Sequence, residues 1–320
     1  MRRRDFIRVI AGSAVAWPLA AHAQQPVIGM LWPGQTPPGS PRMESFTQAL
    51  RQLGFIEGQN VSIELRYARA GLQQLPELAA ELVRLKVDVL ATFGDLTPKI
   101  AQQATETIPI VAISDDIVGA GIVASLSRPG ANTTGLTIMA PELSAKRLEV
   151  LQEMVPRMSH VAALWDPTTG ASQVETTERA ARSLNVSVQV LEVRGRSDID
   201  DAFRTAQSNH ADAVNVFNSP VLSSLYREII DLSAEHRLPT MYQWKEHVEA
   251  GGLLSYGVNL TALWRQAGTI VVKVLKGAKP ADLPVEQPTK FELAVNARTA
   301  KALGIAIPPS VLVRADDLFE

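Results

Sequence analysis

Two adjacent acids, Asp115 and Asp116, follow an apolar run at residues 108–113. A carboxylate in this place can accept a hydrogen bond from a ligand amine, and it can also cap a helix that begins near Val118. We expect one acid in each role. Paired carboxylates also serve glycosidases and proton-transfer enzymes, but adjacent acids at one strand end diverge, and the sequence shows no second catalytic partner. The pair therefore favours binding over catalysis.

A second polar turn, Gly94-Asp95-Leu96-Thr97-Pro98, follows the apolar run at residues 87–92. Thr97 suits the cap of a helix and Pro98 its first turn. The start of that helix offers free backbone N–H groups and the positive end of a dipole, which suit a ligand carboxylate. Asp95 would repel a carboxylate if it pointed inward, but it would suit an ammonium or hydroxyl group. The alternative is that Asp95 only caps the turn.

Aromatic and polar residues follow the other apolar runs. Aromatic rings on both sides of a cleft can sandwich a planar or apolar ligand body, so these residues favour an aromatic or otherwise mostly apolar carboxylate. Trp165 and Tyr256 have an alternative place, packed at a hinge, and Trp264 is expected in the core. The remaining candidate ligand contacts are Trp32, Trp165, Asp166, Asn218, Ser219, Tyr242, Trp244 and Tyr256.

These residues need a framework that brings strand ends together. Short apolar runs alternate with amphipathic stretches along the chain, and this pattern predicts parallel α/β units. Two series of such units, near residues 27–138 and 144–257, predict two doubly wound lobes of similar build. Ligands bind beyond the carboxyl ends of the strands in such sheets, which is where the candidates lie.

The rest of the chain is too short for a third domain. We expect it to cross back to the first lobe for one amphipathic helix at residues 260–276 and then to finish the second lobe. Three crossings make a hinge, and a hinge between two lobes makes a cleft. The expected division is a first lobe of residues 24–138 with 258–280 and a second lobe of residues 139–257 with 281–320.

A short helix is also predicted at residues 118–127, within the first lobe.

The N-terminus has the three parts of an export signal. Four arginines precede an apolar stretch at residues 9–21 that is too short to span a bilayer, and Ala21-His22-Ala23 suits cleavage before Gln24. The segment Arg3-Arg4-Asp5-Phe6-Ile7-Arg8 resembles the twin-arginine consensus; the alternative is an ordinary Sec signal. Residues 1–23 are therefore predicted to be a signal peptide, which directs a free mature protein to the periplasm.

Composition excludes several functional classes. Residues 1–23 hold four Arg and one Asp, so the mature chain keeps 27 basic and 32 acidic residues, a net charge of −5 that gives no reason to expect nucleic acid. The absence of cysteine excludes disulfides, a thiol nucleophile, a lipid-anchored N-terminal Cys and Cys-ligated metals. The mature-chain histidines lack metal-ligand spacing, and no G-x-G-x-x-G follows a strand. We expect no cofactor and no metal.

Five phrases carry a resemblance to a known family. They are Ile108-Pro109-Ile110-Val111, the run Gly121-Ile122-Val123-Ala124-Ser125-Leu126-Ser127-Arg128-Pro129-Gly130-Ala131-Asn132-Thr133-Thr134-Gly135-Leu136, Leu238-Pro239-Thr240-Met241-Tyr242, Glu249-Ala250-Gly251-Gly252-Leu253-Leu254-Ser255-Tyr256-Gly257 and Ala300-Lys301-Ala302-Leu303-Gly304-Ile305-Ala306-Ile307-Pro308. Together they resemble the substrate-binding components of ABC importers with the class I periplasmic-binding fold, in the branch that includes tryptophan and other aromatic amino-acid binders. The resemblance implies a monomer that captures a small molecule without catalysis and delivers it to an ABC permease in the inner membrane.

The ligand loops depart from the family pattern. Family members often have a Gly-Thr-Pro-Ala-type turn where this chain has residues 94–98, an Asp-Pro pair where it has Asp115-Asp116-Ile117, and an Asn-Pro pair where it has Trp165-Asp166-Pro167. These differences leave the ligand open. Two alternatives to transport also stay open: an exported enzyme with an active site between the lobes, and a ligand-sensing partner of a membrane receptor.

Overall fold

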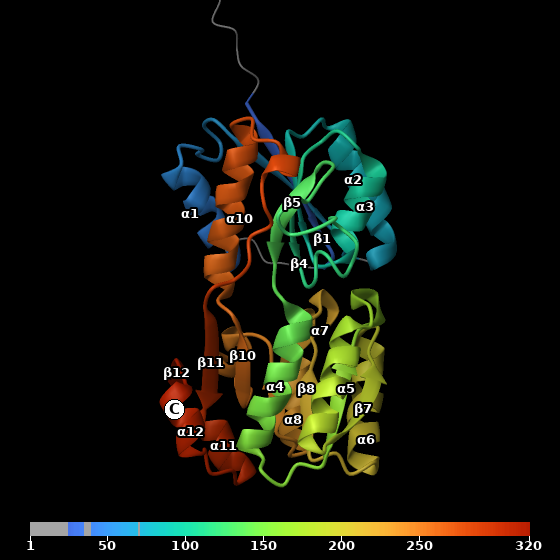
Figure 1. Ribbon diagram of the computed structural model, residues 1–320, viewed down its shortest axis with the longest axis vertical. Helices are drawn as coiled ribbons and strands as arrows, with labels where there is room; N and C mark the ends of the chain where they lie inside the picture. The colour runs from blue at the N-terminus through green and yellow to red at the C-terminus, as the bar shows by residue number, and fades with distance from the viewer. Residues whose placement is uncertain (1–24, 35–39, 70) are drawn as a thin grey trace, which may run out of the picture.

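The computed structural model describes residues 25–34, 40–69 and 71–320. The chain forms two α/β lobes stacked end to end (Figure 1). The expected fold class, two doubly wound parallel-sheet lobes joined by a three-segment hinge, is confirmed. The predicted signal peptide at residues 1–23 lies outside the described residues.

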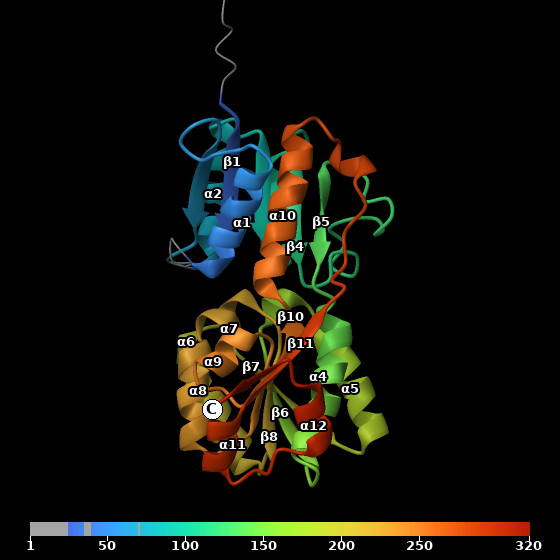
Figure 2. The same ribbon diagram turned by 90° about the vertical axis from the view of Figure 1, so that its left-hand side faces the viewer.

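The first lobe has a five-stranded parallel sheet in the order β2-β1-β3-β4-β5. Helices α1 and α10 lie together against one face, and α2 and α3 cover the other (Figure 2). The three central strands β1, β3 and β4 are buried on both faces, as a sheet covered by helices on two sides requires. The edge strand β2 alternates polar and apolar residues. The elements are β1 Val27–Trp32, α1 Pro41–Gln52, β2 Ser62–Tyr67, α2 Leu75–Arg84, β3 Val89–Phe93, α3 Leu96–Ala104, β4 Ile110–Ser114, β5 Thr133–Thr137 and α10 Leu260–Leu275, with 3-10 turns at Leu72–Gln74 and Pro280–Asp282.

The second lobe has a seven-stranded sheet in the order β12-β11-β10-β9-β8-β6-β7, parallel except where β11 runs against β10. Helices α4 and α5 pack together on one face of it, and α6 and α8 pack together on the other. The elements are α4 Ala140–Met154, β6 His160–Trp165, α5 Ser172–Leu184, β7 Ser187–Glu192, α6 Arg196–Ser208, β8 Ala213–Val216, α7 Pro220–Ser224, α8 Tyr226–Glu235, β9 Thr240–Tyr242, α9 Lys245–Glu249, β10 Leu254–Val258, β11 Phe291–Asn296, α11 Ala297–Leu303, α12 Pro309–Arg314 and β12 Asp317–Phe319, with a 3-10 turn at Pro167–Thr169.

One predicted helix is wrong. Residues 118–127 form a series of turns, in which the backbone N–H groups of Ile122 and Val123 both donate to the carbonyl of Ile117. Asp116 closes the first of these turns, because its carboxylate accepts the N–H of Gly119 at 2.9 Å. Glycine lowers helix propensity, and Gly121 has a positive φ of 70° that a helix does not allow.

Helix α10 is the element that the chain adds to the first lobe after completing most of the second. It packs closely along α1, because Gly268 has no side chain; a Cβ there would lie 2.9 Å from the carbonyl oxygen of Phe46. The buried faces of both helices close the core over β1, β3 and β4. Among the described residues, no helix is both long and apolar enough to cross a bilayer.

The hinge is tied to both lobes by hydrogen bonds. Asn259 caps α10 by accepting the N–H of Ala262 at 2.8 Å, and its amide donates to Glu292 of β11 at 2.6 Å. In the returning link, the N–H of Glu286 donates to Gly135 at 2.9 Å, and its carbonyl accepts the N–H of Thr137 at 3.1 Å. The returning link therefore runs along the edge of β5 before it enters the second lobe.

Replacement of Gly135 by alanine should destabilise the first lobe. Gly135 has a φ of 148°, and a Cβ would lie 1.9 Å from the carbonyl oxygen of Ala112 on β4. We expect Gly135→Ala to lower the free energy of unfolding by about 3 kcal/mol, measured by chemical denaturation. Gly195→Ala is the matched control, because a Cβ there meets nothing within 4 Å. Equal stability of the two variants would contradict the close β4–β5 approach.

Candidate ligand-binding site

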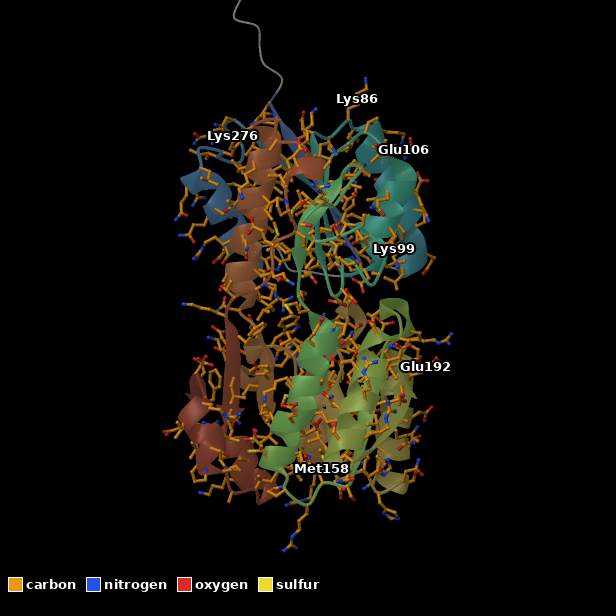
Figure 3. All side chains as sticks on the ribbon, viewed as in Figure 1. Lys86, Lys99, Glu106, Met158, Glu192 and Lys276 are labelled. Atoms are coloured by element: carbon orange, nitrogen blue, oxygen red, sulfur yellow. The ribbon has the colours of Figure 1, made fainter. Side chains whose placement is uncertain are left out.

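A cavity lies between the lobes, at the carboxyl ends of the first-lobe strands. Its volume is about 130 Å³, and it is lined by Trp32, Phe93 and Asp115 from the first lobe and by Asn218 and Trp244 from the second. It lies beside a wider cleft of about 1490 Å³ that both lobes also line. Side chains from both lobes fill much of the space between the two ribbons (Figure 3).

Three aromatic rings form the apolar wall of the cavity. Trp32 ends β1, Phe93 ends β3, and Trp264 lies just over one turn into α10. The ring centroids of Phe93 lie 4.3 Å from those of both Trp32 and Trp264, and the Phe93–Trp264 pair is stacked. Trp244 adds a fourth ring from the second lobe. A wall of this kind suits a planar or apolar ligand body.

Sequence reasoning missed Phe93 and placed Trp264 in the core. Trp264 is 3% exposed and does pack against the first-lobe core, but it also lines the cavity. Both positions carried a usable signal. Phe93 is the last residue of a strand, and Trp264 lies near the start of a helix that begins at a hinge crossing, so each faces the strand-end side of its lobe.

Asp95 serves the structure of the turn. Its carboxylate accepts the hydroxyl of Ser114 at 2.5 Å and the backbone N–H of Asp115 at 2.9 Å. It is buried, and burial raises its pKa above the ordinary range even though these hydrogen bonds lower it. Asp95 thereby fixes the end of β4. Its negative charge also lies next to the carboxyl group of Asp115.

Asp115 is the polar centre of the cavity. Its Oδ1 accepts the side-chain amide of Asn218, which bridges the two lobes, and its Oδ2 has no protein partner among the described residues. Burial raises the pKa of Asp115 well above its ordinary value, and the charge of Asp95 raises it further. The hydrogen bond from Asn218 and the charge of Arg147 act in the opposite direction. The free oxygen suits a hydrogen-bond donor on a ligand.

Gln173 holds Asn218 in place. Its amide donates to the Asn218 carbonyl at 2.9 Å, and its own carbonyl accepts the Asn218 N–H at 2.8 Å. The same carbonyl accepts the hydroxyl of Ser144 at 3.1 Å. These contacts leave Oδ1 of the Asn218 side chain without a partner among the described residues. No sequence pattern pointed to Gln173, which lies on a largely polar helix.

Arg147 of α4 is fully buried beside this site. Its Nε donates to the carbonyl of Tyr256 at 2.7 Å, and its two terminal nitrogens have no hydrogen-bond partner in the described part of the chain. Burial lowers its pKa to about 9, and the charge of Asp115 opposes this change. Within the described residues Arg147 forms no ion pair inside 4 Å. The two lobes thus bring a buried cation and a buried acid near one another.

The other predicted contacts fall into two groups. Trp32, Gly94, Asn218, Ser219 and Trp244 line the cavity with Asp115. Three polar residues organise loops instead. The Thr97 hydroxyl bonds the backbone of Phe93 at 2.7 and 2.8 Å, Asp116 closes a turn, and Asp166 accepts the hydroxyl of Ser219 at 2.6 Å.

Three predicted aromatic contacts lie elsewhere. Tyr242 is buried in the second-lobe core, with its hydroxyl 3.3 Å from that of Ser233. The Trp165 indole donates to the carbonyl of Gly170 at 2.9 Å and does not line the cavity. The Tyr256 ring packs near Phe291 at the hinge, with 6.1 Å between centroids. Of the two places foreseen for Tyr256, the structure shows the hinge.

Residues 39–319 match the family model described as ABC transporter substrate binding protein. The chain belongs to this family. It is similar to a tyrosine-binding protein from Clostridioides difficile (strain R20291), with 25% identity over 264 residues that cover 81% of this chain and 75% of that protein. This family member therefore has a relative named for an aromatic amino acid.

Solved structures share the fold of this ABC transporter substrate-binding protein. An ABC domain from Streptococcus pneumonia in complex with L-Trp matches with a TM-score of 0.86 and 24% identity, over 92% of this chain and all of that one. A conserved domain protein from Vibrio cholerae matches with a TM-score of 0.86 and 23% identity, over the same shares. A ligand-free, open substrate-binding protein from Clostridium difficile matches with a TM-score of 0.65 and 22% identity, over 92% and 99% of the two chains.

Replacement of Asp115 by asparagine should stabilise the protein at neutral pH. The folded state raises the pKa of Asp115, so it binds the proton more tightly than the unfolded chain does, and stability falls as pH rises above the ordinary Asp range. Asparagine keeps the acceptor for Asn218 and has no charge to bury. We expect Asp115→Asn to unfold at higher denaturant than the parent at pH 7.5, with a smaller difference at pH 4.

The exposed Asp200 of α6 supplies the control. Asp200→Asn should leave the pH dependence unchanged in the same denaturation series. The opposite result would be that Asp115→Asn becomes less stable than the parent as the pH rises from 4 to 7.5. It would mean that the carboxylate of the parent is ionised and satisfied in the folded state.

Proposed function

We propose that this protein is the substrate-binding component of an ABC importer and captures an aromatic amino-acid-like ligand between its two lobes. One observation carries the proposal. The interlobe cavity combines an aromatic wall with two buried side chains, Asp115 and Asn218, that each keep one oxygen without a partner among the described residues. A buried polar atom without a partner lowers stability, and a ligand donor satisfies it.

The polar and apolar parts of the cavity set the ligand chemistry. An indole or phenol ring fits against Trp32, Phe93 and Trp264, because offset or edge contacts between rings add to the burial of apolar area. An ammonium group fits Oδ2 of Asp115, and its positive charge would offset the mutual repulsion of Asp115 and Asp95. The names of two relatives, a tyrosine-binding protein and a complex with L-Trp, support the same class.

Binding is proposed to work by closure of the lobes. We take residues 24–138 with 258–280 and residues 139–257 with 281–320 as the two bodies that move. The amide of Asn218 on the second lobe meets Asp115 on the first, so opening the cleft separates the two halves of the site. A ligand that contacts both residues therefore favours the closed arrangement, because it adds contacts that only this arrangement provides.

The setting of this activity rests on the sequence and on the family. We propose that residues 1–23 direct export, by the twin-arginine or the Sec route, and that the protein works as a monomer in the periplasm. Its partner is an ABC permease of the inner membrane, and no catalytic step is needed. The described residues contain no group of three His, Asp or Glu placed to hold a metal.

A ligand screen tests the proposal. Residues 24–320 are screened by thermal shift and by calorimetry against L-Trp, L-Tyr, L-Phe, L-Leu, L-Asp and L-Lys. We expect the aromatic amino acids to raise the melting temperature most, since a ligand at 100 times its Kd adds about 2.7 kcal/mol to stability. Binding confined to the non-aromatic compounds would contradict the ligand class, and turnover of a screened compound would contradict a binding-only role.

Two tryptophan variants locate the binding site. We expect Trp264→Leu to weaken the binding of an aromatic hit about 10-fold, because the ring wall loses its stacked partner. Trp165→Leu is the matched control, since Trp165 does not line the cavity and should leave the calorimetric Kd unchanged. Equal effects of the two substitutions would place the ligand outside this cavity.

A further inference from the structure

Arginines gather at the mouth of the cleft in a protein whose mature chain is acidic. The wide cleft is lined by Arg42 and Arg69 from the first lobe and by Arg194, Arg196 and Arg227 from the second. Two of them are neutralised by ion pairs, Arg194 with Glu192 at 2.9 Å and Arg196 with Glu228 at 3.2 Å. Glu192 lies at the end of the second lobe that faces the first (Figure 3).

The other three arginines keep their charge. Arg69 lies over the ring of Tyr67 at 5.5 Å and Arg227 over that of Tyr226 at 5.2 Å. None of these three has a carboxylate within 4 Å among the described residues. Glu246 lines the same cleft and its charge acts on Arg42, but it forms no ion pair within 4 Å among the described residues. The mouth therefore has an excess of positive charge, which attracts anions and speeds their association.

Arg42 is the member of this group that reaches the inner cavity. It lines both the wide cleft and the aromatic cavity, whereas the other four arginines line only the cleft. It lies in the first turn of α1, where the helix dipole adds to the positive potential. No hydrogen bond from Arg42 to another described residue is formed. Burial lowers the pKa of Arg42, and the charge of Glu246 opposes this change. Since no carboxylate lies within 4 Å of it among the described residues, its guanidinium is open to a ligand where the two spaces meet.

The inner end of the cavity has the opposite character. Asp115 lines the cavity and does not line the wide cleft, and the carboxylate of Asp95 lies behind it. Two acids at this end disfavour an anion there. Arg147 is not among the residues that line either space. The polar groups of the site are thus ordered from acidic at the inner end to basic at the mouth.

We propose that the cleft selects ligands that carry a carboxylate and that Arg42 receives this carboxylate at the junction of the inner cavity and the mouth. The inference rests on the proposed function for the aromatic body of the ligand. It assigns the ligand an orientation, with its donor group towards Asp115 and its anionic group towards Arg42. Arg69 and Arg227 raise the local concentration of anions without contacting the bound ligand.

Three probes with the same indole ring test the orientation: L-tryptophan, tryptamine and indole-3-propionate. We expect Arg42→Gln to weaken the binding of L-tryptophan and indole-3-propionate about 10-fold and to leave tryptamine unchanged. Asp115→Asn should weaken tryptamine and leave indole-3-propionate unchanged. Arg51→Gln, at an exposed position of the same helix, should change none of the three. An equal loss for tryptamine and indole-3-propionate in Arg42→Gln would overturn the assignment.

A second measurement needs no ligand. Replacement of Trp165 by phenylalanine leaves Trp32, Trp244 and Trp264 in the mature chain, and all three line the cavity. Iodide is an anion and acrylamide is neutral, so a positive potential favours quenching by iodide. In this background, at low salt, we expect Arg42→Gln to lower iodide quenching about 2-fold relative to acrylamide quenching. Quenching by caesium should rise, and Arg51→Gln should change neither. If Arg42→Gln left the ratio of iodide quenching to acrylamide quenching unchanged, Arg42 would not create a positive potential where the cavity meets the cleft.

The two measurements distinguish failure of the proposed function from failure of the role assigned to Arg42. If none of the indole probes binds the parent protein, the proposed ligand body is wrong, and the quenching ratio still decides whether Arg42 attracts anions. If the probes bind but Arg42→Gln and Arg51→Gln behave alike in both measurements, the proposed function stands and the role of Arg42 is wrong.

Discussion

A carboxyl group buried between two lobes is the constraint on which this cleft depends. Asp115 is almost fully buried, and its charge is disfavoured both by burial and by Asp95 behind it. The surrounding groups are arranged to limit this penalty. Asn218 donates from the opposite lobe, Gln173 holds Asn218 at its backbone, and Arg147 supplies a buried positive charge. Because Asn218, Gln173 and Arg147 belong to the second lobe and Asp115 to the first, these contacts exist only while the two lobes lie together.

The same arrangement leaves buried polar atoms of the site without hydrogen-bond partners in the part of the chain that the structure describes. Buried polar atoms are nearly always paired, yet Asp115, Asn218 and Arg147 each keep an unpartnered atom in the described chain. Under the proposed function, a ligand bound here would pair atoms that the described residues leave without partners. Stability and affinity therefore draw on the same atoms, as in other sites where binding residues are less stable than their surroundings.

Much of the fold could be predicted from the sequence, because buried parallel strands read as apolar runs and their carboxyl ends mark where ligands bind. Asp115, Asn218 and Trp32 were predicted in this way, and the structure places all three around the same cavity. Trp264 and Gln173 were not assigned to the site, because a helix residue reaches it only through tertiary packing that no local pattern encodes. The turns at residues 118–127 were mistaken for a helix for a related reason: the side chain of Asp116 and the backbone of Ile117 determine them, and composition alone does not.

The path of the chain has a consequence for the order in which the protein can be completed. Helix α10 supplies Trp264 and the close partner of α1, yet it follows nearly all of the second lobe in the sequence. The second lobe in turn waits for β11 and β12 at the end of the chain. Neither lobe can finish its core while the ribosome still holds the last fifth of the chain. The aromatic wall of the cleft is therefore incomplete until α10 adds Trp264 to the rings of Trp32 and Phe93.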